Sequence, residues 1–111
     1  MKKEAPVFIR AYDLHIWLLD RLSGGSELNE VRRAILHHSR ILLEAVTLAL
    51  SRFETRRRVV EADERVTLLR VHLRLATERR LLDDRQLMYA NEILSDIGRQ
   101  IGGWQKRLGD R

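Results

Sequence analysis

The chain has 111 residues, of which 44% are hydrophobic and 33% are charged, so it has the length and apolar content of one folded domain. It contains no cysteine, which excludes disulfide frameworks and thiolate metal sites. No apolar run approaches the roughly 18 residues of a membrane helix, and the basic start of the chain lacks the apolar stretch of a secretion signal. We therefore expect a cytoplasmic protein without membrane contact.

The net charge of +5 is distributed unevenly along the chain. Residues 56–80 carry eight basic and four acidic side chains, whereas the segments before and after are nearly balanced. Eighteen of the 21 basic residues are arginine, whose planar guanidinium suits phosphate and carboxylate groups. Two interpretations are open: a solvated helix face with ion pairs, or a surface for a polyanion or an acidic protein.

The composition is rich in helix-forming residues and has a single proline, which predicts an all-α protein. A first helix is expected over residues 7–22, with one apolar face. The sequence SGGS at 23–26 is the only strong break, and Ser26 is expected to cap a second helix over 27–54. The apolar stripe of that second helix consists of Leu28, Val31, Ile35, Leu42, Ala45, Ala49 and Phe53.

A third helix is predicted over residues 57–80 because apolar residues recur there at alternating spacings of three and four. The junction before it contains neither Gly nor Pro, so the pattern also allows one long bent helix over 27–80. A straight helix of that length would measure about 80 Å, and we therefore predict a turn near Thr55. The seam of the third helix consists of Val59, Ala62, Val66, Leu69, Leu73 and Ala76.

A fourth helix is predicted over residues 84–108, preceded by a capping box formed by Asp83 and Gln86. Four helices with short connections and one apolar face each make an antiparallel up-down four-helix bundle, here a single domain over residues 1–111. The apolar seam of the fourth helix consists of Leu87, Ala90, Leu94, Ile97, Ile101, Trp104 and Leu108.

A second stripe of small residues lies beside this seam, at spacings of four, three and four. Small side chains in a row let another helix approach closely, and that helix belongs either to the same bundle or to a neighbouring subunit. With the two residues that follow, the positions predicted for oligomerisation or close helix packing are Asn91, Ser95, Gly98, Gly102, Gly103 and Trp104.

The sequence predicts no catalytic residue, no metal ion and no cofactor, and hence no enzyme. None of the four histidines follows a glutamate by three residues, as a bundle-type di-iron site requires. His38 lies on the apolar face of its helix and is expected to be a hydrogen-bonded core residue. Asp83 and Asp84 are better explained by helix capping than by catalysis.

The arginines of residues 56–80 are the remaining candidate site. Arg58, Arg65, His72 and Arg79 recur every seven residues and therefore share one edge of the third helix. Three arginines at its start oppose the helix dipole, a cost that is easier to understand if a partner supplies negative charge. The candidate nucleic-acid-binding residues are Arg56, Arg57, Arg58, Arg65, Arg70, Arg74 and Arg79.

Three stretches, at residues 12–22, 68–94 and 97–108, resemble the accessory variability determinant (Avd) family of diversity-generating retroelements. More distantly, the chain is similar to the four-helix-bundle proteins encoded in rRNA intervening sequences. Arg70 and Arg74 match the two arginines of the family's LRxxLR pattern. Its glycine and tryptophan end is matched by Gly98, Gly102, Gly103 and Trp104. Residues 23–33 lack the basic and aromatic stretch that family members carry after the first helix.

The resemblance implies a barrel-like homopentamer with a basic surface and no enzyme activity of its own. Its implied partners are the retroelement's reverse transcriptase and template RNA. Two hypotheses follow: an accessory factor that binds polymerase and nucleic acid through the arginines, or a structural interaction protein whose charges only keep it in solution.

Overall fold

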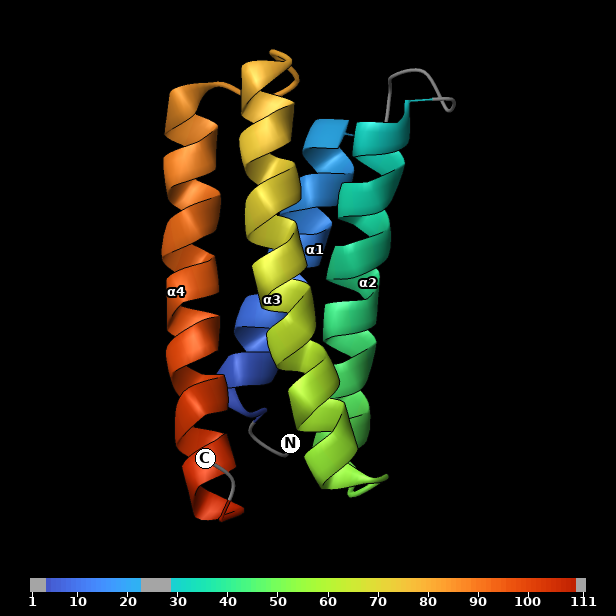
Figure 1. Ribbon diagram of the computed structural model, residues 1–111, viewed down its shortest axis with the longest axis vertical. Coiled ribbons are helices and arrows are strands. Elements are labelled where there is room, and N and C mark those ends of the chain that lie inside the picture. Colours follow the sequence, from blue (N-terminus) through green and yellow to red (C-terminus); the bar gives the residue numbers. More distant parts are fainter. Residues whose placement is uncertain (1–3, 23–28, 110–111) are drawn as a thin grey trace.

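Four α-helices make up the protein in a computed structural model that describes residues 4–22 and 29–109 (Figure 1). No strand occurs within those two ranges, which confirms an all-α fold of four helices. Successive helices run antiparallel, and α1 begins at the end of the bundle where α4 finishes. The helices are α1 (Pro6–Leu22), α2 (Glu30–Leu50), α3 (Thr55–Glu78) and α4 (Asp84–Arg107).

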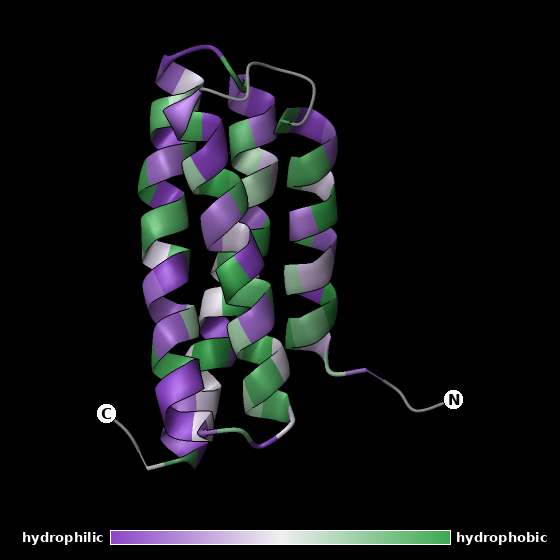
Figure 2. Ribbon diagram, turned by 90° about the vertical axis from the view of Figure 1, so that its right-hand side faces the viewer, coloured by the Kyte–Doolittle hydropathy of each residue, from purple (hydrophilic) through white to green (hydrophobic). Residues whose placement is uncertain are grey.

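Each helix packs against two others, so the helices follow one another around the bundle in chain order. The contact between α2 and α3 is the most extensive, and the α1–α4 contact closes the bundle. Hydrophobic residues recur along each helix (Figure 2), and most residues of the predicted seams lie in the core. All six predicted seam residues of α3 are buried. Four of the seven in α4 are also buried, and the other three pack against the core at its ends.

The start of α2 differs from the prediction. The helix begins at Glu30 rather than at residue 27, because the side chain of Asn29 accepts a hydrogen bond from the backbone N–H of Arg32 (3.0 Å) and caps it. The predicted break at SGGS and the predicted cap Ser26 lie outside the described residues.

The turn between α2 and α3 begins and ends at other residues than predicted. The second helix ends at Leu50 rather than at residue 54, and the third begins at Thr55 rather than at 57. Arg52 and Glu54 adopt positive φ angles of 67° and 51°, so the chain reverses without glycine. Phe53, predicted to continue the core stripe of α2, lies in this turn and is 62% exposed.

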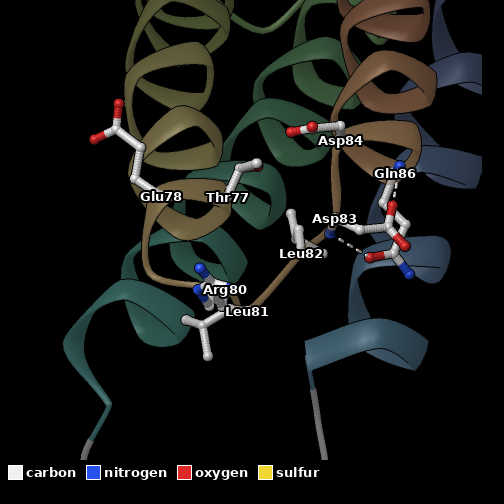
Figure 3. Close-up of a pocket in the computed structure, with 8 residues that line it drawn as sticks. All are labelled: Thr77, Glu78, Arg80, Leu81, Leu82, Asp83, Asp84 and Gln86. Carbon is white, nitrogen blue, oxygen red and sulfur yellow. Dashed lines mark hydrogen bonds between the residues drawn. The ribbon is translucent and has the colours of Figure 1, made fainter.

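The turn between α3 and α4 contains the predicted capping box. The Asp83 carboxylate accepts from the backbone N–H of Gln86 (2.7 Å), and the Gln86 side chain accepts from the backbone N–H of Asp83 (3.0 Å), as Figure 3 shows. The cap that the sequence predicts at Asp83 is therefore present. The chain leaves α3 two residues earlier than predicted, with Arg80 at a φ of 63°.

Polar contacts connect α1 to both of its neighbours. Ser39 of α2 is fully buried, and its Oγ lies 2.6 Å from Nδ1 of His15 of α1. On the other side, Nε of Arg10 donates to the carboxylate of Asp96 of α4 (2.8 Å). Arg99 of α4 also donates to Asp96. The hydrogen bond from Arg10, and then the one from Arg99, lower the pKa of Asp96. Both contacts set the register of α1 on the bundle.

Candidate nucleic-acid interface

Arg65 and His72 of α3 face α2 along the boundary between the two helices. We call these residues, together with His38 of α2, the α2–α3 edge. At its centre, Nη1 of Arg65 lies 2.8 Å from Nδ1 of His38, and the His38 ring stacks on His72 with centroids 5.1 Å apart. Two imidazoles and a guanidinium therefore meet where α2 and α3 pack.

The hydrogen bond from Arg65 fixes the protonation state of His38. A guanidinium only donates, so Nδ1 of His38 must accept and the ring is neutral with its proton on Nε2. Partial burial lowers the pKa of His38, and the charges of Arg65, His72 and His37 lower it further. His38 is thus hydrogen-bonded as predicted, but it lies partly exposed on the α2–α3 edge rather than in the core.

Acidification is expected to destabilise the fold. The pKa of His38 is lowered, and so is that of His15, mainly by burial and then by Arg40. Because the unfolded chain then binds more protons, the free energy of unfolding should fall as the pH drops below about 6.5. Urea unfolding at about pH 7.5 and about pH 5 measures this, in a range where carboxylates stay ionised.

The His38→Gln variant should show a smaller loss of stability over the same pH range, because an amide oxygen can accept from Arg65 without titrating. His37→Gln leaves the Arg65–His38 contact in place and serves as the matched control; it should keep most of the wild-type dependence, because His37 contributes least to the lowered pKa of His38. A wild-type stability that does not change between the two pH values would contradict the prediction.

The start of α3 neutralises part of its own basic charge. Nε and Nη2 of Arg57 donate to the carboxylate of Glu54 at 3.0 and 2.8 Å, and this contact lowers the pKa of Glu54. Arg58 lies 3.3 Å from Glu61 and 3.9 Å from Glu54. Glu54 directly precedes the helix and supplies negative charge to Arg57 and Arg58, so the cost of these two arginines is offset within the chain.

The remaining predicted arginines do not extend the α2–α3 edge. Nη2 of Arg70 donates to Oγ of Ser95 of α4 (3.1 Å), on the opposite side of α3. Arg74 is 79% exposed and pairs with Glu78 at 3.2 Å. Arg56 is exposed in the first turn, and Arg79 is exposed at the C-cap. The seven arginines thus surround α3 rather than forming one face.

The small-residue stripe of α4 lies open along its α3 side. A Cβ atom added at Gly98 or Gly102 would meet nothing within 4 Å, so no other described helix approaches these glycines closely. Ser95 accepts from Arg70, and Oδ1 of Asn91 is buried without a hydrogen-bond partner. Trp104 packs against the core, and a Cβ at Gly103 would lie 3.5 Å from Arg107. Close packing within the described bundle therefore does not explain Gly98 and Gly102.

The partners of two arginines were missed by sequence reasoning. His38 is 27 residues from Arg65, and Ser95 is 25 residues from Arg70. The heptad spacing of the arginines placed Arg65 on an edge, and the apolar spacing placed His38 on the inner face of its helix. Only the packing of α2 against α3 shows that the two side chains meet.

The fold and this surface define a small all-helical bundle whose third helix is ringed by arginines. Within residues 4–22 and 29–109, no group of three or more histidine or carboxylate side chains is arranged to hold a metal ion. No helix among the described residues is long and apolar enough to cross a membrane. Comparisons with protein-family models, with curated proteins and with solved structures find no match for this chain.

Proposed function

We propose that the chain is a non-enzymatic, cytoplasmic accessory factor of a diversity-generating retroelement. In this role it is a basic oligomer that binds the reverse transcriptase and template RNA and supports cDNA synthesis in mutagenic retrohoming. The proposal starts from the resemblance of residues 12–22, 68–94 and 97–108 to the Avd family. The observation that carries it is the concentration of basic charge on α3 and the two residues after it, where eight basic side chains accompany four acidic ones over residues 56–80.

Phosphate contacts are the mode of binding that this surface supports. Arg65 and Arg70 are partly exposed on opposite edges of α3, and the side chain of Arg74 is largely exposed to solvent. Guanidinium groups at several angles suit a flexible or folded RNA backbone better than a single straight duplex groove. The α2–α3 edge offers no Phe, Tyr or Trp on which single-stranded bases would stack. Binding should therefore be electrostatic and weakly selective for sequence.

A second candidate is a structural interaction protein of the rRNA intervening-sequence type, with no nucleic-acid role. The intramolecular ion pairs favour it, because Arg57, Arg58 and Arg74 each have a carboxylate of the same chain within 4.0 Å. In that case the arginines stabilise and solubilise the bundle, and no partner is needed to balance them.

RNA affinity measured over a salt series, with and without the cognate reverse transcriptase, separates the two functions. The accessory factor should bind RNA with an affinity that falls steeply as salt rises, or should capture the polymerase. The structural protein should do neither. A wild-type chain that binds neither RNA nor polymerase at low salt would overturn the proposal.

Assembly into a homopentameric barrel is part of this proposal and is drawn from the resemblance. The open stripe of α4 supports an intersubunit contact, since Gly98 and Gly102 leave room for a backbone that the described bundle does not provide. A neighbouring subunit seated on this stripe would cover Asn91 and Ser95 as well.

Gly98→Leu should therefore disrupt the oligomer while leaving the helices intact. Within the subunit an added Cβ atom would meet nothing within 4 Å, and replacing glycine inside a helix favours that helix by about 0.8 to 1 kcal/mol. Gly98→Ala is the matched control, because it brings the same helical benefit with a single methyl group. Sedimentation and far-UV circular dichroism check the two effects. A wild-type chain that sediments as a monomer at micromolar concentration would contradict the expectation.

A further inference from the structure

The third helix carries apolar side chains on two sides. Its inner seam fills the core, and four further residues form a row on the side that faces away from α2 and α4. Scattered surface hydrophobics are ordinary, but several on one side of one helix mark a contact surface. Glu64 interrupts this side of α3 between Val60 and Leu68. No helix of the described chain covers it. We call this row the outer row of α3; it consists of Val60, Leu68, Val71 and Leu75, which are 39% to 61% exposed.

The two ends of the outer row are symmetric about a point between Thr67 and Leu68, and the same symmetry pairs Leu68 with Thr67 and Val71 with Glu64. Val60 and Leu75 lie equally far from this point on either side. One turn beyond them, also at equal distances, lie Arg57 and Glu78, which carry opposite charges. A second copy of the helix laid antiparallel across the row would set Val60 against Leu75 and Arg57 against Glu78. Both pairs would occur twice, as a two-fold axis requires.

We propose that the outer row of α3 binds the same row of a second copy of this chain, with the two helices antiparallel about a two-fold axis near Leu68. The paired segment, from Arg57 to Glu78, is about 32 Å long at 1.5 Å per residue. Glu64 then lies near Arg74 of the second copy. This charge pattern selects the antiparallel arrangement, because a parallel pair would set like charges against each other.

The ion pairs inside each subunit do not oppose this contact. Arg57 pairs with Glu54, and Arg74 pairs with Glu78, but all four side chains are at least 56% exposed. Exposed pairs of this kind contribute little and rearrange readily. The contact uses neither the α2–α3 edge nor the small stripe of α4, so the inference does not rest on the proposed function.

Single cysteines test the arrangement directly, because the chain contains no cysteine of its own. Leu68→Cys should form a disulfide-linked dimer with itself, since the axis brings the two copies of residue 68 together. Val60→Cys should link to Leu75→Cys when the two proteins are mixed. Val60→Cys should not link to itself, because its two copies would lie about 22 Å apart along the helices, beyond the reach of a disulfide.

Ile16→Cys is the matched control, because Ile16 is similarly exposed, at 42%, on the outer side of α1. Each variant is checked for helicity, and Thr67→Cys, also beside the axis, replaces Leu68→Cys if that variant does not fold. The inference is correct if the Leu68 dimer forms several-fold faster than the Ile16 dimer. It is overturned if the two rates are equal, if Val60→Cys links to itself, or if Leu68→Cys links preferentially to Ile16→Cys.

A second measurement uses assembly without cross-linking. Val71→Glu places four carboxylates, two from each copy, at the centre of the paired rows, since Glu64 lies opposite residue 71. Sedimentation should show the loss of the two-fold contact at concentrations where the wild type keeps it. Ile16→Glu should keep it. Equal assembly of the wild type and the Val71→Glu variant would count against the contact even if the cysteines link.

Discussion

Leu73→Ala is expected to lower the free energy of unfolding by about 2 to 5 kcal/mol, the usual cost of removing a fully buried leucine from a core. Leu73 is completely buried in the C-terminal third of α3, among the seam residues that pack between α2 and α4. The void left by the lost atoms would lie between helices on both sides, where neither helix can move to fill it without disturbing the other.

Leu50→Ala is the matched control, because Leu50 is 41% exposed at the end of α2. Its loss should cost about 1 kcal/mol or less. Urea unfolding of both variants at one protein concentration measures the difference, since assembly makes apparent stability depend on concentration. Equal destabilisation by the two substitutions would mean that the seam of α3 is not the core of the bundle.

Removing three arginines from α3 is expected to have the largest effect on RNA binding. In the variant with Arg65, Arg70 and Arg74 changed to glutamine, each lost phosphate contact should reduce the slope of log affinity against log salt by about 0.7 to 0.9. Three lost contacts therefore lower the slope by roughly 2 to 3. In an oligomer the change repeats on every subunit, so the measured loss of affinity would be larger.

The control for this variant removes the same charge elsewhere. Arg33, Arg85 and Arg107 are exposed on α2 and α4, and changing them to glutamine should alter the salt slope less. If the α3 variant loses stability while its folded fraction binds RNA as before, the arginines are structural. If it folds and binds RNA normally but no longer captures the polymerase, the arginine surface contacts protein rather than nucleic acid.

The helical seams could be predicted because they depend on a simple spacing. In α3 the spacing of three and four continues over the whole helix, and all of its predicted core residues are buried. The capping box of Asp83 and Gln86 could be predicted for a similar reason, since it depends only on residues close in sequence. Patterns of this kind depend only on residues close in sequence, so they do not require knowledge of how the helices pack.

The ends of the helices at the α2–α3 turn could not be predicted in the same way. Arg52 and Glu54 adopt a left-handed conformation that usually indicates glycine or asparagine, and nothing in their side chains signals it. The tight reversal is imposed by the packing of α2 on α3. Phe53 is exposed for the same reason, because the helix that would have carried it inward ends three residues earlier.

The candidate site was predicted in composition but not in arrangement. Sequence spacing placed arginines around α3, but which carboxylate or imidazole each one contacts depends on other helices. The outer row of α3 was also not predicted, because the seam residues alone account for the apolar spacing expected of one helix face. Its residues are ordinary in the sequence and become conspicuous only when α2 and α4 leave that side of α3 uncovered.

The chain-order packing of the helices also determines how the protein can fold. Three of its four helix contacts join elements that follow one another in the chain, so each can form as a hairpin before the rest is in place. Contacts this local allow a bundle to fold in about microseconds to milliseconds. Only the α1–α4 contact, with Arg10 and Asp96 separated by 86 residues, must close a long loop. Docking of the first helix against the last should therefore be the final step of folding and the first contact to open.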